Sequence, residues 1–183
     1  MQKHMKNMIL AALVAISLVL PAKGEEPKAK IEGAFGLKLG DKFDVSKATW
    51  TRTLDDGDVL YGFQPTKPFK GMHDYYVSIT PDESLIYTIS ALQKFDSATE
   101  AQAECDVICH ILENKYGPFD KPRIGETMSG IKRIMRDHRI VQVDLDKAFA
   151  ASVQIVYVDL ELFSDSEKKK IASKAAQVDA SGL

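Results

Sequence analysis

Alternating hydrophobic and polar positions predict short β-strands in the first half of the chain. Residues 33–43, GAFGLKLGDKF, carry apolar side chains at every second position between glycines, which is typical of a strand bounded by turns. Between residues 48 and 94, apolar-rich segments are separated by Asp-Asp-Gly at 55–57 and by Pro-Asp-Glu at 81–83, and these residue types favour tight turns. The pattern predicts an antiparallel meander over residues 48–94.

The spacing of the apolar residues changes to three or four between Ser97 and Gly117, which predicts an amphipathic helix. Ser97 and Glu100 have the spacing of a capping box, and Gly117 followed by Pro118 ends the helical pattern. The predicted buried stripe consists of Ala101, Cys105, Ile108, Leu112 and Tyr116.

Three more strands and a second helix are predicted after residue 129. The strands lie at 130–136, 139–145 and 152–162, and the last is apolar on both faces, as in a central strand. A second capping box begins at Ser164 and predicts a C-terminal helix over about 165–177. Because strands occur in meanders separated by helices, we predict a two-layer α+β fold, with a mainly antiparallel sheet of about seven strands and two helices on one face.

The N-terminus has the pattern of a secretory signal peptide. A short basic segment at residues 3–6 precedes an uninterrupted apolar run at 8–20, which is shorter than the roughly 20 residues of a membrane-spanning helix. The small residues Ala22 and Gly24 have the spacing that a signal peptidase recognises. The pattern predicts a signal peptide over residues 1–24, and a retained membrane anchor is the alternative.

Removal of the signal peptide would leave one domain over residues 25–183, with loose tails at 25–31 and 178–183. We expect a periplasmic protein with no membrane span after cleavage, and secretion from the cell is the alternative. The whole chain has 183 residues and a formal net charge of −2. The mildly acidic balance predicts no nucleic-acid binding, since that depends on an excess of clustered positive charge.

Several structural motifs resemble those of small uncharacterised periplasmic proteins of Gram-negative bacteria. They are GAFGLKLG at the start of the domain, IYTISALQKF before the central helix, and ENKYG at the end of that helix. Some members of this group have the fold of the β-lactamase inhibitor protein, which implies the same α+β architecture here. The matching motifs contain no catalytic group, so the resemblance implies no activity.

The stretch Cys105-Asp-Val-Ile-Cys109-His110 leaves several interpretations open. A c-type haem site has two cysteines and an adjacent histidine, but its usual spacing is one residue shorter. A thiol redox site needs a cysteine of low pKa, whereas the neighbouring acids Glu104 and Asp106 disfavour the thiolate. A metal site would need His110 beside both thiols, although one helical residue turns it about 100° away from Cys109.

Structural interpretations of the cysteine pair compete with these. An intrachain disulfide suits an exported chain, but it requires a tighter helical turn than usual. The alternatives are disulfides between two chains, which would give a linked dimer, and two buried free thiols that pack as small hydrophobic groups. We predict a Cys105–Cys109 disulfide and no cofactor.

The loop that contains QPTKPFKGMHDYY, residues 64–76, is the candidate partner-binding segment. It is longer than a tight hairpin needs, and it combines aromatic and methionine side chains with positive charge, as partner-binding surfaces do. The candidate residues are Lys67, Phe69, Lys70, Met72, His73 and Tyr75. The alternative is that Phe69 packs onto the edge of the sheet.

These observations favour a non-enzymatic exported protein. We expect it to bind another periplasmic protein or a component of the cell envelope, through the sheet face or the loop, as a monomer or a disulfide-linked dimer. The alternative function is that of a c-type haem or thiol redox protein using Cys105, Cys109 and His110.

Overall fold

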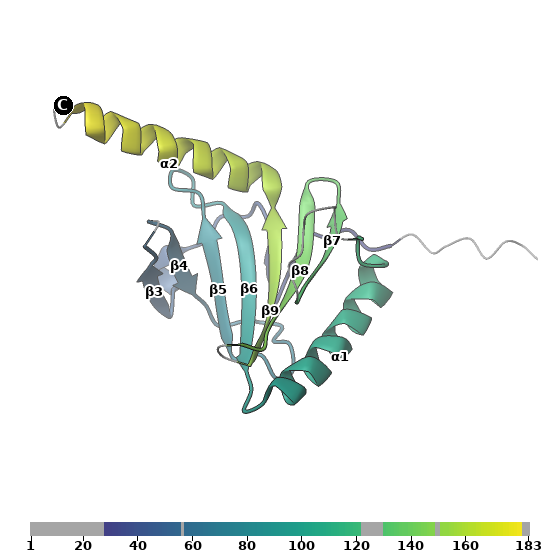
Figure 1. The fold of residues 1–183 in the computed structure, drawn as a ribbon. Coiled ribbons are helices and arrows are strands. Elements are labelled where there is room, and N and C mark those ends of the chain that lie inside the picture. Colours follow the sequence, from purple (N-terminus) through teal and green to yellow (C-terminus); the bar gives the residue numbers. More distant parts are fainter. Residues whose placement is uncertain (1–27, 56, 122–129, 149–150, 181–183) are drawn as a thin grey trace, which may run out of the picture.

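Seven strands form one antiparallel sheet in the order β3-β4-β5-β6-β9-β8-β7 (Figure 1). The computed structural model describes residues 28–55, 57–121, 130–148 and 151–180, so the predicted signal peptide lies outside the described residues. The strands are β3 (Trp50–Thr53), β4 (Val59–Gly62), β5 (Asp74–Ile79), β6 (Ile86–Lys94), β7 (Ile131–Arg136), β8 (Arg139–Asp146) and β9 (Ser152–Asp159). The predicted α+β fold, the two meanders and the central position of the last strand are confirmed.

The pairing of β6 with β9 joins the two meanders in the middle of the sheet. Ile89 lies opposite Tyr157 and Ala91 opposite Ile155, and these four side chains are buried on the same face. Because side chains alternate along a strand, Ser90 and Gln154 belong to the opposite face. The two faces therefore have different environments.

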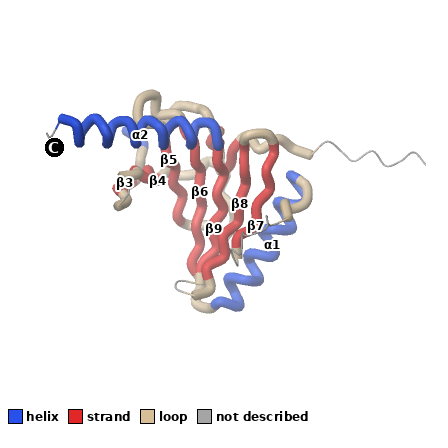
Figure 2. The backbone as a smooth tube through the Cα atoms, turned by 45° about the horizontal axis from the view of Figure 1, so that its top comes forward, coloured by secondary structure: helices blue, strands red, loops and turns tan. Residues whose placement is uncertain are grey.

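Helix α1 (Ala98–Tyr116) covers β8 and β9 on the buried face (Figures 1 and 2). The predicted caps are confirmed: the Ser97 hydroxyl accepts from the Glu100 N–H at 3.2 Å, and Gly117 adopts a positive φ of 97°. The predicted stripe from Ala101 to Tyr116 is buried, and Cys109 is buried with it.

An N-terminal hairpin covers the neighbouring part of the same face. It consists of β1 (Gly33–Ala34) and β2 (Leu37–Lys38), where the sequence predicted one strand. Phe35 at its turn is buried, and its ring lies 5.1 Å from that of Tyr75 on β5. Residues before the hairpin are also ordered: Ile31 is buried and the Ala29 N–H donates to the Lys115 carbonyl, so the prediction of a loose segment up to residue 31 is wrong for residues 28–31.

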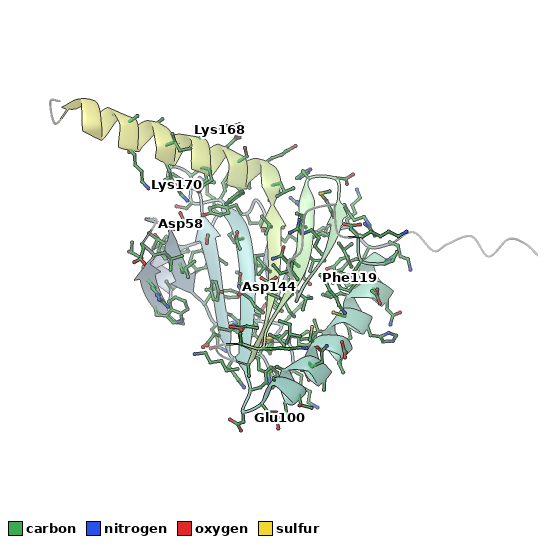
Figure 3. All side chains as sticks on the ribbon, in the orientation of Figure 1. Asp58, Glu100, Phe119, Asp144, Lys168 and Lys170 are labelled. Carbon is green, nitrogen blue, oxygen red and sulfur yellow. The ribbon has the colours of Figure 1, made fainter. Side chains whose placement is uncertain are left out.

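Helix α2 (Leu160–Ala180) follows β9 directly and runs along one end of the sheet. Its N-terminus lies earlier than the capping box at Ser164 predicted, because the buried carboxylate of Asp159 accepts from the Leu162 N–H at 3.2 Å. Its C-terminus also lies later than predicted, since residues 178–180 are helical. Lys170 contacts Asp58 at the tip of the β3–β4 hairpin (Figure 3).

Asp159 connects α2, the sheet and the N-terminal segment. Its carboxylate pairs with Arg139 at 3.0 Å and lies 3.5 Å from His138. The Arg139 guanidinium also donates to the carbonyls of Ile31 and Leu39, each at 3.3 Å. One buried carboxylate thus orients the cation that holds the N-terminal hairpin against the sheet. Among the residues that the structure describes, no helix combines the length and apolar character needed to cross a bilayer.

Replacing Asp159 with alanine is expected to lower the free energy of unfolding by about 3 kcal/mol, because it removes a helix cap and leaves a largely buried Arg139 unpaired. The matched control is Asp165→Ala, which breaks an exposed pair with Lys168 and should change stability by less than about 1 kcal/mol. Urea unfolding followed by circular dichroism measures both. Equal stability of the two variants would contradict this role of Asp159.

Candidate functional site

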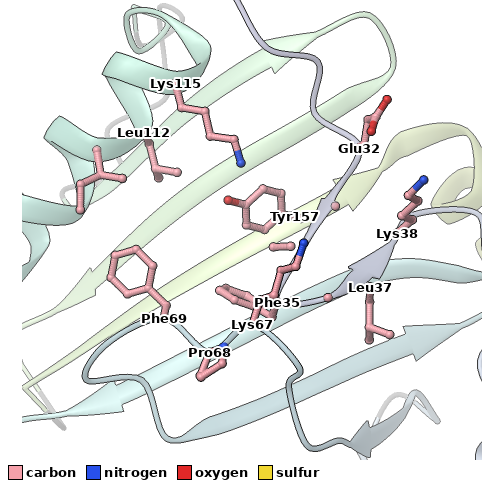
Figure 4. A pocket seen from close by; sticks show the side chains of 14 residues that line it. Glu32, Phe35, Leu37, Lys38, Lys67, Pro68, Phe69, Leu112, Lys115 and Tyr157 are labelled. Atoms are coloured by element: carbon pink, nitrogen blue, oxygen red, sulfur yellow. The ribbon is translucent and has the colours of Figure 1, made fainter.

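A cavity of about 420 Å³ lies between the N-terminal hairpin, the loop of residues 67–69 and the C-terminal half of α1 (Figure 4). We call it the hairpin–helix cavity. Its lining includes Phe35, Lys67, Phe69, Leu112, Lys115 and Tyr157. They come from four segments that are far apart in the sequence, so the cavity exists only in the folded domain.

The floor of the cavity is aromatic. The Tyr157 ring lies 6.0 Å from that of Phe35 and 6.3 Å from that of Tyr116, both in edge-to-face geometry. Burial, together with the neighbouring Tyr116 hydroxyl, raises the pKa of Tyr157 well above its usual value. Tyr157 is therefore an uncharged phenol at neutral pH and presents a largely apolar surface.

The loop is held at the cavity by hydrogen bonds to Tyr75 and to the hairpin. The Tyr75 hydroxyl accepts from the Phe69 N–H at 3.0 Å and donates to the Phe69 carbonyl at 3.1 Å. The Lys67 N–H donates to the Phe35 carbonyl at 3.3 Å. At Gly36, φ is +97° and an added Cβ would lie 1.9 Å from the Thr66 hydroxyl, so this close approach requires glycine.

Two lysines converge over the aromatic floor. In Figure 4 the side chains of Lys67 and Lys115 extend toward Tyr157, from the loop and from α1 respectively, and the Lys115 amine lies 4.8 Å from the centroid of the neighbouring Tyr116 ring. Glu32 and Lys38, which also line the cavity, point away from the Tyr157 ring. Within the described ranges, neither Lys67 nor Lys115 forms an ion pair. Neither positive charge is balanced by a carboxylate of the described residues, and the Lys115 charge lies against the face of the Tyr116 ring.

The structure divides the six loop candidates into three groups. Lys67 and Phe69 line the cavity, and Phe69 is half-buried with its ring packed against the core. Lys70 and His73 are exposed and are not among the lining residues. Met72 and Tyr75 are buried in the core, so the expectation that they form an exposed partner surface is wrong for these two residues.

Sequence reasoning missed several lining residues. The sequence patterns predict Phe35 and Tyr157 only as strand residues and Lys115 only as a polar position of the helix. The available signal was the helical pattern itself, because Lys115 is three residues after Leu112 and lies beside the buried stripe. Its proximity to Lys67 depends on long-range packing that no local pattern reveals.

The cysteines form a separate buried contact. Their sulfur atoms are unbonded and 3.9 Å apart, and both face the sheet. The hydrogen bond from Cys105 and the positive charge of Lys132 on β7 lower the pKa of Cys109, while the same contact and burial raise that of Cys105. The acids beside Cys105 are expected to disfavour its thiolate, and its pKa is raised, mainly by the contact with Cys109 and by burial and less by Asp106. At Cys109 the effect of Lys132 is larger than that of Asp106.

His110 does not join the two thiols. It is exposed on α1, whereas Cys105 and Cys109 are buried. Among the described residues, no group of three or more His, Cys, Asp or Glu side chains is placed to hold a metal ion. The geometry therefore gives no support to the haem or metal interpretation. The burial of both sulfurs also favours a bond within the chain over one between chains.

The sheet face opposite α1 is the other candidate surface. The exposed Trp50 on edge strand β3 lies with its ring 6.0 Å from that of Tyr76, whose hydroxyl accepts from Gln154 at 2.7 Å. Asp144 is on the same face, and burial raises the pKa of its carboxyl group. These groups form a broad surface of hydrogen-bonded polar and apolar side chains.

Comparison with known proteins found no matching family, no matching curated protein and no matching solved structure. The resemblance to periplasmic proteins of the β-lactamase-inhibitor-protein fold therefore stays a prediction from the motifs.

The contact between the Cys105 and Cys109 sulfur atoms predicts that oxidation joins them to each other. With oxidised glutathione at pH 7, the pair should form one intrachain disulfide and release two glutathione thiols, giving an intact mass about 2 Da below that of the reduced monomer. Lys132→Ala should slow this reaction at least about threefold, because the pKa of Cys109 rises and less thiolate is present. Lys147→Ala is the control. Lys147 lines the same cavity as Cys105 and Lys132, but it does not contribute to the lowered pKa of Cys109.

Mass spectrometry of quenched time points measures the rates. A product of twice the monomer mass, or equal rates in the Lys132 and Lys147 variants, would contradict the prediction.

Proposed function

We propose that the chain is an exported, non-enzymatic protein of the periplasm that binds a component of the cell envelope in the hairpin–helix cavity. The observation that carries this proposal is the cavity itself, which the predicted partner-binding loop lines with Lys67 and Phe69. The apolar run and small residues at the N-terminus support export. A Cys105–Cys109 disulfide, for which the 3.9 Å contact is a starting point, would suit that compartment.

The character of the lining supports binding. Ligand sites are typically cavities of about 300–1,000 Å³ with mostly apolar walls and a few polar groups that orient the ligand. The hairpin–helix cavity has such a volume, aromatic and aliphatic walls, and two converging amines. The amines of Lys67 and Lys115 and the phenol of Tyr157 are among its polar groups, and such groups can hold a ligand in place.

Contacts within the folded chain hold the walls of the cavity in place, and this also supports a role in binding. Its walls are held by the Tyr75 hydrogen bonds to Phe69 and by the close approach of Gly36 to Thr66. A site that is already formed before the ligand arrives loses less conformational entropy on binding. These contacts favour the cavity over the broad opposite face as the place where a ligand binds.

Thiol redox activity at Cys105 and Cys109 is the second candidate function. The observation that favours it is the contact between the two sulfurs beside Lys132, which lowers the pKa of Cys109. A low-pKa thiolate next to a second thiol is the arrangement that thiol–disulfide exchange uses. The burial of both sulfurs limits access by a protein substrate.

Blocking the cavity tests the first proposal. Ile111 lines it and is 42% exposed, so Ile111→Trp should fill it at small cost to stability. Val107, one turn earlier on α1, is 53% exposed and does not line it, and Val107→Trp is the matched control. With the uncharged fluorescent probe N-phenyl-1-naphthylamine, wild type and Val107→Trp should show saturable binding at one site.

Ile111→Trp should weaken that binding about tenfold or more, because the indole occupies the volume that the probe needs. Fluorescence titration measures the affinities, and thermal unfolding checks that both variants are folded. No saturable binding by wild type, or equal affinity of the two tryptophan variants, would overturn the proposal.

A further inference from the structure

We infer that the ligand of the hairpin–helix cavity is a small molecule with an apolar body and an anionic group, and that the anion lies between Lys67 and Lys115. The inference rests on the proposed function and specifies the chemistry of the ligand. Its basis is the convergence of two amines from different elements over an aromatic floor (Figure 4).

The two amines form a place for negative charge. Lys67 is fixed at its backbone by the hydrogen bond to Phe35, and Lys115 is fixed by the helix, whose next residue Tyr116 is buried. Both side chains extend from these fixed backbone positions along the cavity lining, and the Lys115 amine lies against the ring of Tyr116, which packs edge-to-face on Tyr157. An anion between them would receive charge-assisted hydrogen bonds from both, and these are stronger than bonds between neutral groups.

No carboxylate of the described residues neutralises these charges. The ion pairs of other lysines show that carboxylates are readily available elsewhere: Lys169 pairs with Asp82, and Lys170 pairs with Asp58 and Glu167. In the described part of the chain, Lys67 and Lys115 have no such partner. The cavity lining includes three lysines and one acid, although the chain as a whole has a net charge of −2.

The rest of the lining determines the body of the ligand. Phe35 and Phe69 present aromatic rings, and Leu112 adds an aliphatic surface from α1. Tyr157 stays uncharged at neutral pH, because burial raises its pKa, so it adds no negative charge that would repel an anion. Apolar contact with these groups would stabilise the body while the amines hold the charged end.

Two fluorescent probes that share one skeleton test the inference. 8-Anilino-1-naphthalenesulfonate carries a sulfonate on the skeleton of N-phenyl-1-naphthylamine, which is uncharged. At low ionic strength, wild type should bind the sulfonate about tenfold more tightly than the uncharged probe, because only the sulfonate can pair with both amines. Added salt should reduce this difference, since the paired amines are exposed at the rim.

Charge reversal locates the anion. Lys67→Glu and Lys115→Glu should each weaken sulfonate binding about tenfold and change the affinity for the uncharged probe less than about twofold. Lys70→Glu is the control, because it makes the same charge change in the same loop but lies outside the cavity lining. It should change both affinities less than about twofold. Thermal unfolding confirms that each variant is folded.

The outcomes separate this inference from the proposed function. Equal affinity of wild type for the two probes, or an equal effect of the three charge reversals on sulfonate binding, overturns the anionic ligand but leaves cavity binding in place. Failure of wild type to bind the uncharged probe, or binding that Ile111→Trp does not weaken, overturns the proposed function as well. Selective loss of sulfonate binding in the Lys67 and Lys115 variants supports the inference.

Discussion

The antiparallel pairing of β6 with β9 is the constraint on which the rest of the structure depends. Each strand belongs to a different meander, and their register places Ile89, Ala91, Ile155 and Tyr157 on one face. A shift of one residue would move these side chains to the opposite face and leave polar groups beneath α1. The register therefore determines both the core and the floor of the cavity, because Tyr157 belongs to both.

Two covering elements share the buried face, and the cavity lies where they meet. Helix α1 covers β8 and β9, and the N-terminal hairpin covers the neighbouring strands through Phe35. Tyr157 contacts both covers, since its ring packs against Phe35 on one side and Tyr116 on the other. Arg139, oriented by Asp159, holds the hairpin against the sheet. The stability of the fold and the shape of the cavity thus depend on the same contacts.

Local patterns predicted the elements well and their long-range arrangement poorly. The helix cap at Ser97 and the turns could be predicted from the sequence, because each depends on hydrogen bonds or backbone angles within a few residues. The start of α2 was misplaced because the cap is Asp159, which the pattern assigned to a strand. The burial of Tyr75 could also be predicted, since Tyr75 and the buried Val77 lie on the same face of β5. The composition of the loop led instead to the prediction of an exposed side chain. The shared position of Lys67 and Lys115 in one cavity could not be predicted, because it follows from packing between distant segments.

Mapping of backbone amide chemical shifts during titration with N-phenyl-1-naphthylamine tests the central claim most directly, because it distinguishes the two faces of the sheet in one experiment. A ligand in the hairpin–helix cavity should shift the amides around Phe35, Phe69 and Lys115, at the rim and walls. Shifts concentrated instead at Trp50 and Tyr76, on the face opposite α1, would contradict the account and identify that face as the binding surface.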